Sequence, residues 1–184
     1  PLLGQIMWNQ SMPYNDMCPY DSDAQERCPT GCVATAWAQI MKYWEWPVNG
    51  VGSYSYNSSY GVLTADFTKT YEWDTMRDTY TSYYDENWNI VNEWTQEEGE
   101  AVAQLMADLG VALEMNYAPG GSGANDAMVQ RAMHDHFRYQ VENHPRLSMS
   151  SSEFVDLLVT ELQQSRPVYF SGGSASGTGH AFVV

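Results

Sequence analysis

The chain has 184 residues, enough for one domain of ordinary size or for two small lobes that share a core. Its 8 Lys and Arg against 23 Asp and Glu give a formal net charge of −15, and an acidic surface repels phosphate backbones and anionic membranes. Nucleic acids and membranes are therefore not expected as partners. No apolar run approaches the length of a membrane span, and the 43% share of hydrophobic residues is that of a folded globular protein.

The first 29 residues carry turn signals and are expected to form loops. An amphipathic helix is predicted from Cys32 to about Trp46, because Pro29 prevents a helix from entering from upstream and Pro47 ends it. Its apolar face comprises residues at helical spacing, namely Val33, Ala36, Trp37, Ile40, Met41 and Trp44. Residues 51–84 show no sustained period and are expected to form loops with short strands.

A second helix is predicted to start at Thr95, which pairs with Glu98 in a capping box, and to end at Gly110. Its apolar stripe comprises Ala101, Val102, Leu105, Met106 and Leu109. The alternation of apolar and polar residues then predicts a strand over residues 111–117, and a glycine-rich turn follows over residues 119–123.

Two further helices and a hairpin complete the predicted elements. The third helix begins at Asn125 or Asp126, and the fourth begins at Ser150 with Glu153 in the capping-box position. The third helix is expected to bury Met128, Val129, Ala132, Met133 and Phe137, and the fourth carries the apolar residues Phe154, Leu157, Leu158 and Leu162. Two apolar strands at residues 167–170 and 180–184, joined by a glycine-rich loop at 171–179, close the chain. This order predicts an α+β fold with a helical lobe and a sheet lobe.

Cys32 is the first candidate for chemistry. It lies in the first turn of the predicted helix, where unpaired backbone N–H groups and the positive end of the helix dipole favour a thiolate. The alternative is a buried thiol that serves as a small apolar side chain. These residues alone leave both interpretations open, although Gly31 and the polar residues before Cys32 favour an accessible site.

A cysteine nucleophile needs a histidine as its base, and the chain has four. His134 and His136 fall outside the apolar stripe of the third helix and are expected on the solvated surface, and His144 is expected in a loop. His180 heads an apolar strand directly after the glycine-rich loop, so its ring either caps the strand or points into a site.

The remaining cysteines and the glycine loops give no sign of a cofactor. The three cysteines lack the paired spacing of a zinc site, and no phosphate-binding glycine loop links a strand to a helix. Neither a metal nor another cofactor is therefore expected. Cys18 and Cys28 would pair in an oxidising compartment and remain thiols in a reducing one.

Several motifs resemble, in the right order, the streptopain family of papain-like cysteine peptidases. TGCVATAWAQIMKYW (Thr30 to Trp44) resembles the nucleophile helix of that family, and GHAFVV (Gly179 to Val184) resembles its histidine strand. Further matching stretches are IMWNQSMPYN, LMADLGVALEMNYAPGGSGA, VQRAM and RPVYF. The resemblance covers most of the chain and is thin only between about Asn49 and Thr95.

The resemblance assigns Cys32 as the nucleophile, His180 as its acid/base partner and Gln10 as the side-chain donor of the oxyanion hole. It implies a papain-like α+β catalytic domain, with residues 1–115 mainly in the helical lobe and residues 116–184 starting the sheet lobe. The implied activity is that of a secreted bacterial endopeptidase that cleaves proteins and peptides and favours an apolar side chain two residues before the cut. The 171–179 loop is a candidate wall of the cleft.

The resemblance also implies a zymogen whose N-terminal propeptide blocks the cleft, so that this sequence corresponds to a mature form. The family continues past the histidine strand to an Asn–Trp segment that orients the histidine, whereas this sequence stops at Val184. We therefore expect the 184 residues to be part of a longer polypeptide.

Two other functions remain open. A Cys–His acyltransferase, similar to a transglutaminase, would keep the same site and pass the acyl group to an amine. A non-catalytic carbohydrate-binding module would instead use the aromatic residues that gather between Tyr54 and Trp94 among short polar ones.

Overall fold

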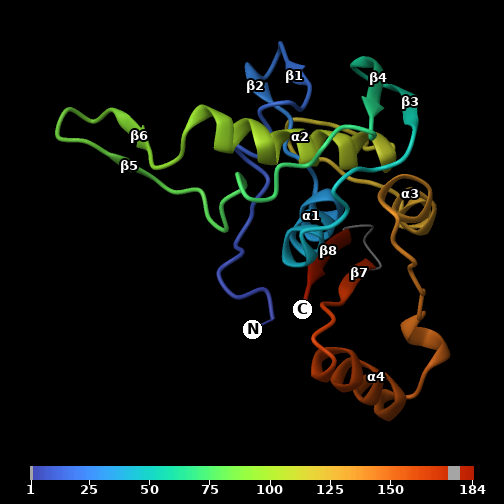
Figure 1. The fold of residues 1–184 in the computed structure, drawn as a ribbon. Helices are drawn as coiled ribbons and strands as arrows, with labels where there is room; N and C mark the ends of the chain where they lie inside the picture. The colour runs from blue at the N-terminus through green and yellow to red at the C-terminus, as the bar shows by residue number, and fades with distance from the viewer. Residues whose placement is uncertain (1, 174–178) are drawn as a thin grey trace.

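The computed structural model describes residues 2–173 and 179–184. This part of the chain contains four α-helices and four two-stranded antiparallel sheets (Figure 1). The helices are α1 (Cys32–Trp44), α2 (Gln96–Ala112), α3 (Ala127–Phe137) and α4 (Ser151–Gln163), with a 3₁₀ turn η1 at Arg146–Ser148. The hairpins pair β1 (Tyr20–Asp21) with β2 (Glu26–Arg27), β3 (Ser53–Ser58) with β4 (Gly61–Asp66), β5 (Ser82–Tyr84) with β6 (Ile90–Asn92), and β7 (Tyr169–Gly173) with β8 (Gly179–Val183). The predicted α+β class is confirmed.

Helix α1 forms the centre of the core. It packs against α2 on one side and against the β7–β8 hairpin on another, while the β3–β4 hairpin packs against α2. The predicted apolar stripe of α1 is buried except at Trp44, which is 47% exposed. The helix ends at this residue rather than at Trp46, because Glu45 adopts a left-handed conformation with φ of 46°. Lys42 in the last turn is buried and donates to the carbonyl of Trp73.

Helix α2 begins as predicted but ends later. Thr95 and Glu98 form the expected reciprocal capping box. The prediction that Gly110 ends the helix is wrong, since α2 continues to Ala112. A Cβ at this glycine would lie only 1.9 Å from the hydroxyl of Tyr117, so the close approach of that ring explains the glycine. The strand predicted over residues 111–117 is also wrong, because its first two residues are helical and only an isolated bridge between Asn116 and Gly123 follows.

The last two helices start as predicted and the final hairpin is present, but β7 begins at Tyr169 and continues to Gly173, three residues into the predicted loop. Helix α3 starts after Asp126, and α4 starts after Ser150 with the predicted capping box. In α3 the predicted residues Val129, Ala132, Met133 and Phe137 are buried, whereas Met128 is only partly buried. The apolar residues of α4 are partly buried or, at Val155 and Val159, exposed. In the hairpin, Tyr169 pairs with Val183 and Gly172 with His180. Residues 174–178 of the predicted cleft-wall loop lie outside the described residues.

Candidate active site

Cys32 is the first residue of α1, and its side chain is partly exposed. Gly31 precedes it with φ of 87°, a conformation that glycine adopts without strain. A Cβ on Gly31 would lie 2.6 Å from the Sδ atom of Met115 and 3.1 Å from the carbonyl oxygen of Ser122. The Thr35 hydroxyl donates to the carbonyl of Gly31 at 2.9 Å, which fixes the turn before the helix. Both the backbone conformation and the close packing therefore favour glycine at the position directly before Cys32.

Gln10 lies beside this turn. The backbone N–H of Thr30 donates to the carbonyl of Gln10 at 3.1 Å. Trp8 fixes the same segment, because its backbone N–H donates to Gln39 Oε1 on α1 at 3.3 Å and its indole N–H donates to the carbonyl of Arg77 at 2.9 Å. The role of Gln10 as an oxyanion donor is predicted only from the family resemblance. The structure places its backbone next to Thr30, two residues before Cys32.

His180 lies on β8, the strand that packs against α1. Its neighbour Ala181 is buried in the core, whereas the His180 ring is exposed and stacks on Phe182 with 6.3 Å between ring centroids. Among the described residues, no hydrogen bond joins the imidazole to the Cys32 thiol. The structure thus brings the elements that carry the two residues together, and their catalytic pairing stays a prediction.

Tyr169 is a further residue of this site that the sequence pattern did not single out. It lies on β7, and its hydroxyl donates to Asp126 at 2.8 Å. Its ring stacks on Trp37 of α1 with 5.5 Å between centroids and an interplanar angle of 26°. Burial and the Asp126 carboxylate raise the pKa of the phenol, so it remains a hydrogen-bond donor. Tyr169 therefore connects the histidine hairpin to the nucleophile helix. An apolar strand pattern carries no signal for such a contact.

The other two cysteines are buried thiols rather than a disulfide. The Cys18 thiol lies 3.9 Å from the hydroxyl of Tyr117, and the Cys28 thiol lies 3.3 Å from that of Tyr60. Burial raises the pKa of Cys18 to about 12. This thiol is therefore protonated over the whole physiological pH range, and of the three cysteines only Cys32 has partial access to solvent.

The remaining histidines lie elsewhere. His134 is exposed beside Asp135, and His144 is exposed beside Glu142, as expected. The surface prediction for His136 is wrong in part, because its ring stacks on Phe67 with 4.3 Å between centroids.

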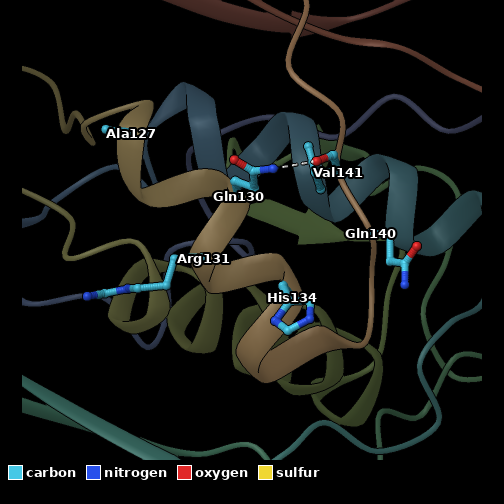
Figure 2. A pocket seen from close by; sticks show the side chains of 6 residues that line it. All are labelled: Ala127, Gln130, Arg131, His134, Gln140 and Val141. Atoms are coloured by element: carbon cyan, nitrogen blue, oxygen red, sulfur yellow. Dashed lines mark hydrogen bonds between the residues drawn. The ribbon is translucent and has the colours of Figure 1, made fainter.

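Two surface grooves lie outside the predicted site. A groove of about 480 Å³ lies beside α3, and Gln130 in its lining donates to the carbonyl of Val141 at 2.8 Å. Figure 2 shows the side chains that line this groove. A second groove of about 440 Å³ lies between the β1–β2 hairpin and α2 and includes the buried carboxylate of Asp108. Neither groove is lined by Cys32, His180 or Gln10.

Within the described ranges, no group of three or more His, Cys, Asp or Glu side chains is arranged to hold a metal ion. None of the helices in the described part of the chain has the length and apolar character needed to span a membrane.

Solved structures with this fold include active wild-type interpain A cysteine protease of Prevotella intermedia. That structure matches with a TM-score of 0.83 and 33% identity over 97% of this chain and 73% of its own. A fragment of Prevotella intermedia prointerpain A matches with a TM-score of 0.83 and 34% identity over 98% of this chain and 55% of its own. These matches establish the papain-like α+β fold.

Sequence relatives agree with the structural ones. A model of the Peptidase C10 family matches residues 8–184, and the chain belongs to that family. Streptopain of Streptococcus pyogenes is 33% identical over 97% of this chain and 47% of its own length. The thiol protease/hemagglutinin PrtT of Porphyromonas gingivalis is 33% identical over 97% of this chain and 20% of its own length. The chain thus spans about half the length of the streptopains and a fifth of PrtT.

Proposed function

We propose that this chain forms the catalytic site of a cysteine endopeptidase that hydrolyses peptide bonds in proteins. The observation that carries the proposal is the position of Cys32, which is partly exposed at the start of α1 while Cys18 and Cys28 are buried. Membership of the Peptidase C10 family supports the same conclusion.

The proposed reaction uses three residues. His180 takes the proton of the Cys32 thiol, and the resulting thiolate attacks the carbonyl carbon of the substrate peptide bond. The backbone N–H of Cys32 and the side-chain amide of Gln10 donate hydrogen bonds to the negative oxygen of the tetrahedral intermediate. His180 then gives its proton to the leaving amine, and the acyl group stays on the Cys32 sulfur as a thioester. Water hydrolyses this thioester, and the free thiol returns.

We further propose that the protein is made as an exported precursor. A pro form of interpain A exists as a solved structure, which supports an inhibitory N-terminal propeptide in this protein too. Since a blocking segment would cover Cys32, removal of the segment should switch the activity on.

Casein hydrolysis by the full-length protein, with and without an irreversible thiol reagent, tests the proposed function. We expect the reagent to abolish hydrolysis and peptide mapping to find it on Cys32. An added primary amine should leave hydrolysis as the main reaction, whereas amide products would indicate an acyltransferase. Hydrolysis that persists after complete modification of Cys32, or in a Cys32→Ala variant, would overturn the assignment.

A further inference from the structure

The β5–β6 hairpin and its turn form an aromatic arm, residues 81–93, which extends away from the helices (Figure 1). In the register of the hairpin, Tyr84 lies opposite Ile90, and both side chains are exposed. The rings of Tyr84 and Trp88 lie 6.0 Å apart at an angle of 50°. Large apolar side chains normally lie in the interior, so this exposed group requires an explanation.

Trp88 at the tip is the least expected residue of the arm. Its side chain is 82% exposed, and its backbone has φ of 61°. The left-handed conformation costs a residue with a bulky side chain roughly 1–2 kcal/mol, and glycine or asparagine is the usual choice there. No burial of the indole offsets this cost. A strained, exposed residue of this kind is typical of a binding site.

The turn holds Trp88 in one position. The carboxylate of Asp85 accepts hydrogen bonds from the backbone N–H groups of Asn87 and Asn89, both at 2.8 Å. The side-chain amide of Asn89 adds a third bond to this carboxylate at 3.2 Å. The backbone N–H of Trp88 donates to the carbonyl of Asp85 at 3.0 Å. The aromatic surface is therefore presented by a rigid turn, which lowers the entropic cost of binding.

The negative charge of the arm indicates that its ligand is cationic. Between Arg77 and Arg131 the sequence has no lysine, arginine or histidine, and the acidic residues Asp85 and Glu86 lie between Tyr84 and Trp88 in the sequence. Aromatic faces next to carboxylates attract ammonium and guanidinium groups by cation–π and Coulombic interactions. A folded protein partner would have to cover about 800 Å² on each side, which is more than the tip of one hairpin offers. A flexible cationic segment needs much less.

We propose that the aromatic arm binds a lysine- or arginine-containing flexible segment of a polypeptide, with the cation over Trp88 and Tyr84 and beside the carboxylates of Asp85 and Glu86. The arm thus captures cationic protein substrates, and this role as a substrate exosite rests on the proposed peptidase function.

The base of the arm lies beside the segment that leads to Gln10. The backbone N–H of Met7 donates to the carbonyl of Asp78 at 3.0 Å, and the Trp8 indole donates to the carbonyl of Arg77. A hairpin of this length extends roughly 20 Å, which about six residues of an extended substrate can span. A longer polypeptide held at the tip can therefore extend past the base of the arm toward the segment that carries Gln10.

Binding is tested in the Cys32→Ala background, which prevents cleavage and makes the result independent of the catalytic assignment. The probe is a fluorescent peptide of lysine and arginine spaced by glycine and serine, and citrulline and glutamine replace the cations in the control peptide. We expect binding of the cationic probe alone, and weaker binding at higher salt concentration. Trp88→Gly should weaken binding roughly two- to fivefold, the range of one cation–π contact at an exposed site.

Trp88→Gly also separates binding from structure, because glycine adopts φ of 61° without strain. Its melting temperature should equal or exceed that of the parent while binding falls. Tyr83→Ala, on the opposite face of the hairpin, should bind the probe like the parent. Equal binding of both peptides, unchanged binding by Trp88→Gly, or Trp88-dependent binding of neutral oligosaccharides in place of the cationic probe would overturn the proposal.

Discussion

The backbone N–H of Thr30 donates a 3.1 Å hydrogen bond to the carbonyl of Gln10, and this bond joins two segments that are 20 positions apart in the sequence. Cys32 begins its helix two residues after Thr30. The backbone of Gln10 is therefore fixed relative to the nucleophile helix, and only the torsions of its own side chain remain to place the amide. A fixed backbone is one requirement for an oxyanion donor that needs little reorganisation when charge develops on the substrate oxygen.

Replacement of Gln10 by alanine should therefore slow the chemical step. Loss of one oxyanion donor typically lowers turnover about 10²–10³-fold, roughly 2.7–4 kcal/mol. We expect Gln10→Ala to lower kcat by this factor and to leave KM nearly unchanged in steady-state peptide hydrolysis. Gln5→Ala, an exposed glutamine on the same segment, is the matched control and should behave as wild type. A wild-type kcat in Gln10→Ala would show that Gln10 is a loop residue without a catalytic role.

His180→Ala should abolish turnover, because the Cys32 thiol then lacks its base and the leaving amine lacks its acid. The fold should persist, since the His180 side chain is exposed while the adjacent Ala181 provides the buried contact. Circular dichroism and the melting temperature check the fold. His134→Ala, at another exposed histidine, serves as the control and should retain nearly full activity. Equal losses in the two variants would show that the wrong histidine was assigned.

Local signals in the sequence predicted the helix starts correctly. Thr95 and Ser150 cap α2 and α4 as expected, because a capping box depends on residues only three positions apart. Gly110 misled the prediction since its role comes from the Tyr117 ring, a tertiary contact. The contact of Tyr169 with Trp37 was missed for the same reason.

The candidate site likewise contains one residue with a local sequence signal and others without one. Cys32 could be proposed from its own helix, whereas His180 was selected by its position at a strand start and Gln10 by family resemblance alone. The left-handed backbone conformation of the exposed Trp88 could not be predicted, because a hydrophobic pattern carries no information on φ.

The three thiols should differ in their reactivity with iodoacetamide. Burial raises the pKa of Cys18 to about 12, so its thiolate, the reactive form, is scarce below pH 10. In the unfolded chain the pKa of the same thiol lies near its ordinary value. Above about pH 8.5 we therefore expect Cys18 to react readily only when denaturant has unfolded the protein. We expect Cys32 to be modified first at neutral pH in the native protein, and Cys18 only after unfolding. Peptide mapping by mass spectrometry identifies the modified residue. Modification of native Cys18 or Cys28 before Cys32 would contradict the assignment.

The turn that precedes Cys32 gives the last prediction. Gly31 has φ of 87°, and a Cβ there would meet the Met115 side chain at 2.6 Å and the Ser122 carbonyl at 3.1 Å. Because both the backbone conformation and the space disfavour a side chain, Gly31→Ala should lower the free energy of unfolding by about 1–3 kcal/mol. For a chain of this size the melting temperature should fall by roughly 2–4 °C per kcal/mol.

Cys32 of the same variant should react more slowly with iodoacetamide, since displacement of the turn moves the thiol from its partly exposed position at the start of α1. Gly120→Ala is the matched control, because no atom lies within 4 Å of the added Cβ and its backbone is not left-handed. It should change neither the melting temperature nor the rate of Cys32 alkylation. If Gly31→Ala melted and reacted like Gly120→Ala, the entry to α1 would tolerate a side chain, and the close packing of Met115 against Gly31 would have no part in positioning the nucleophile.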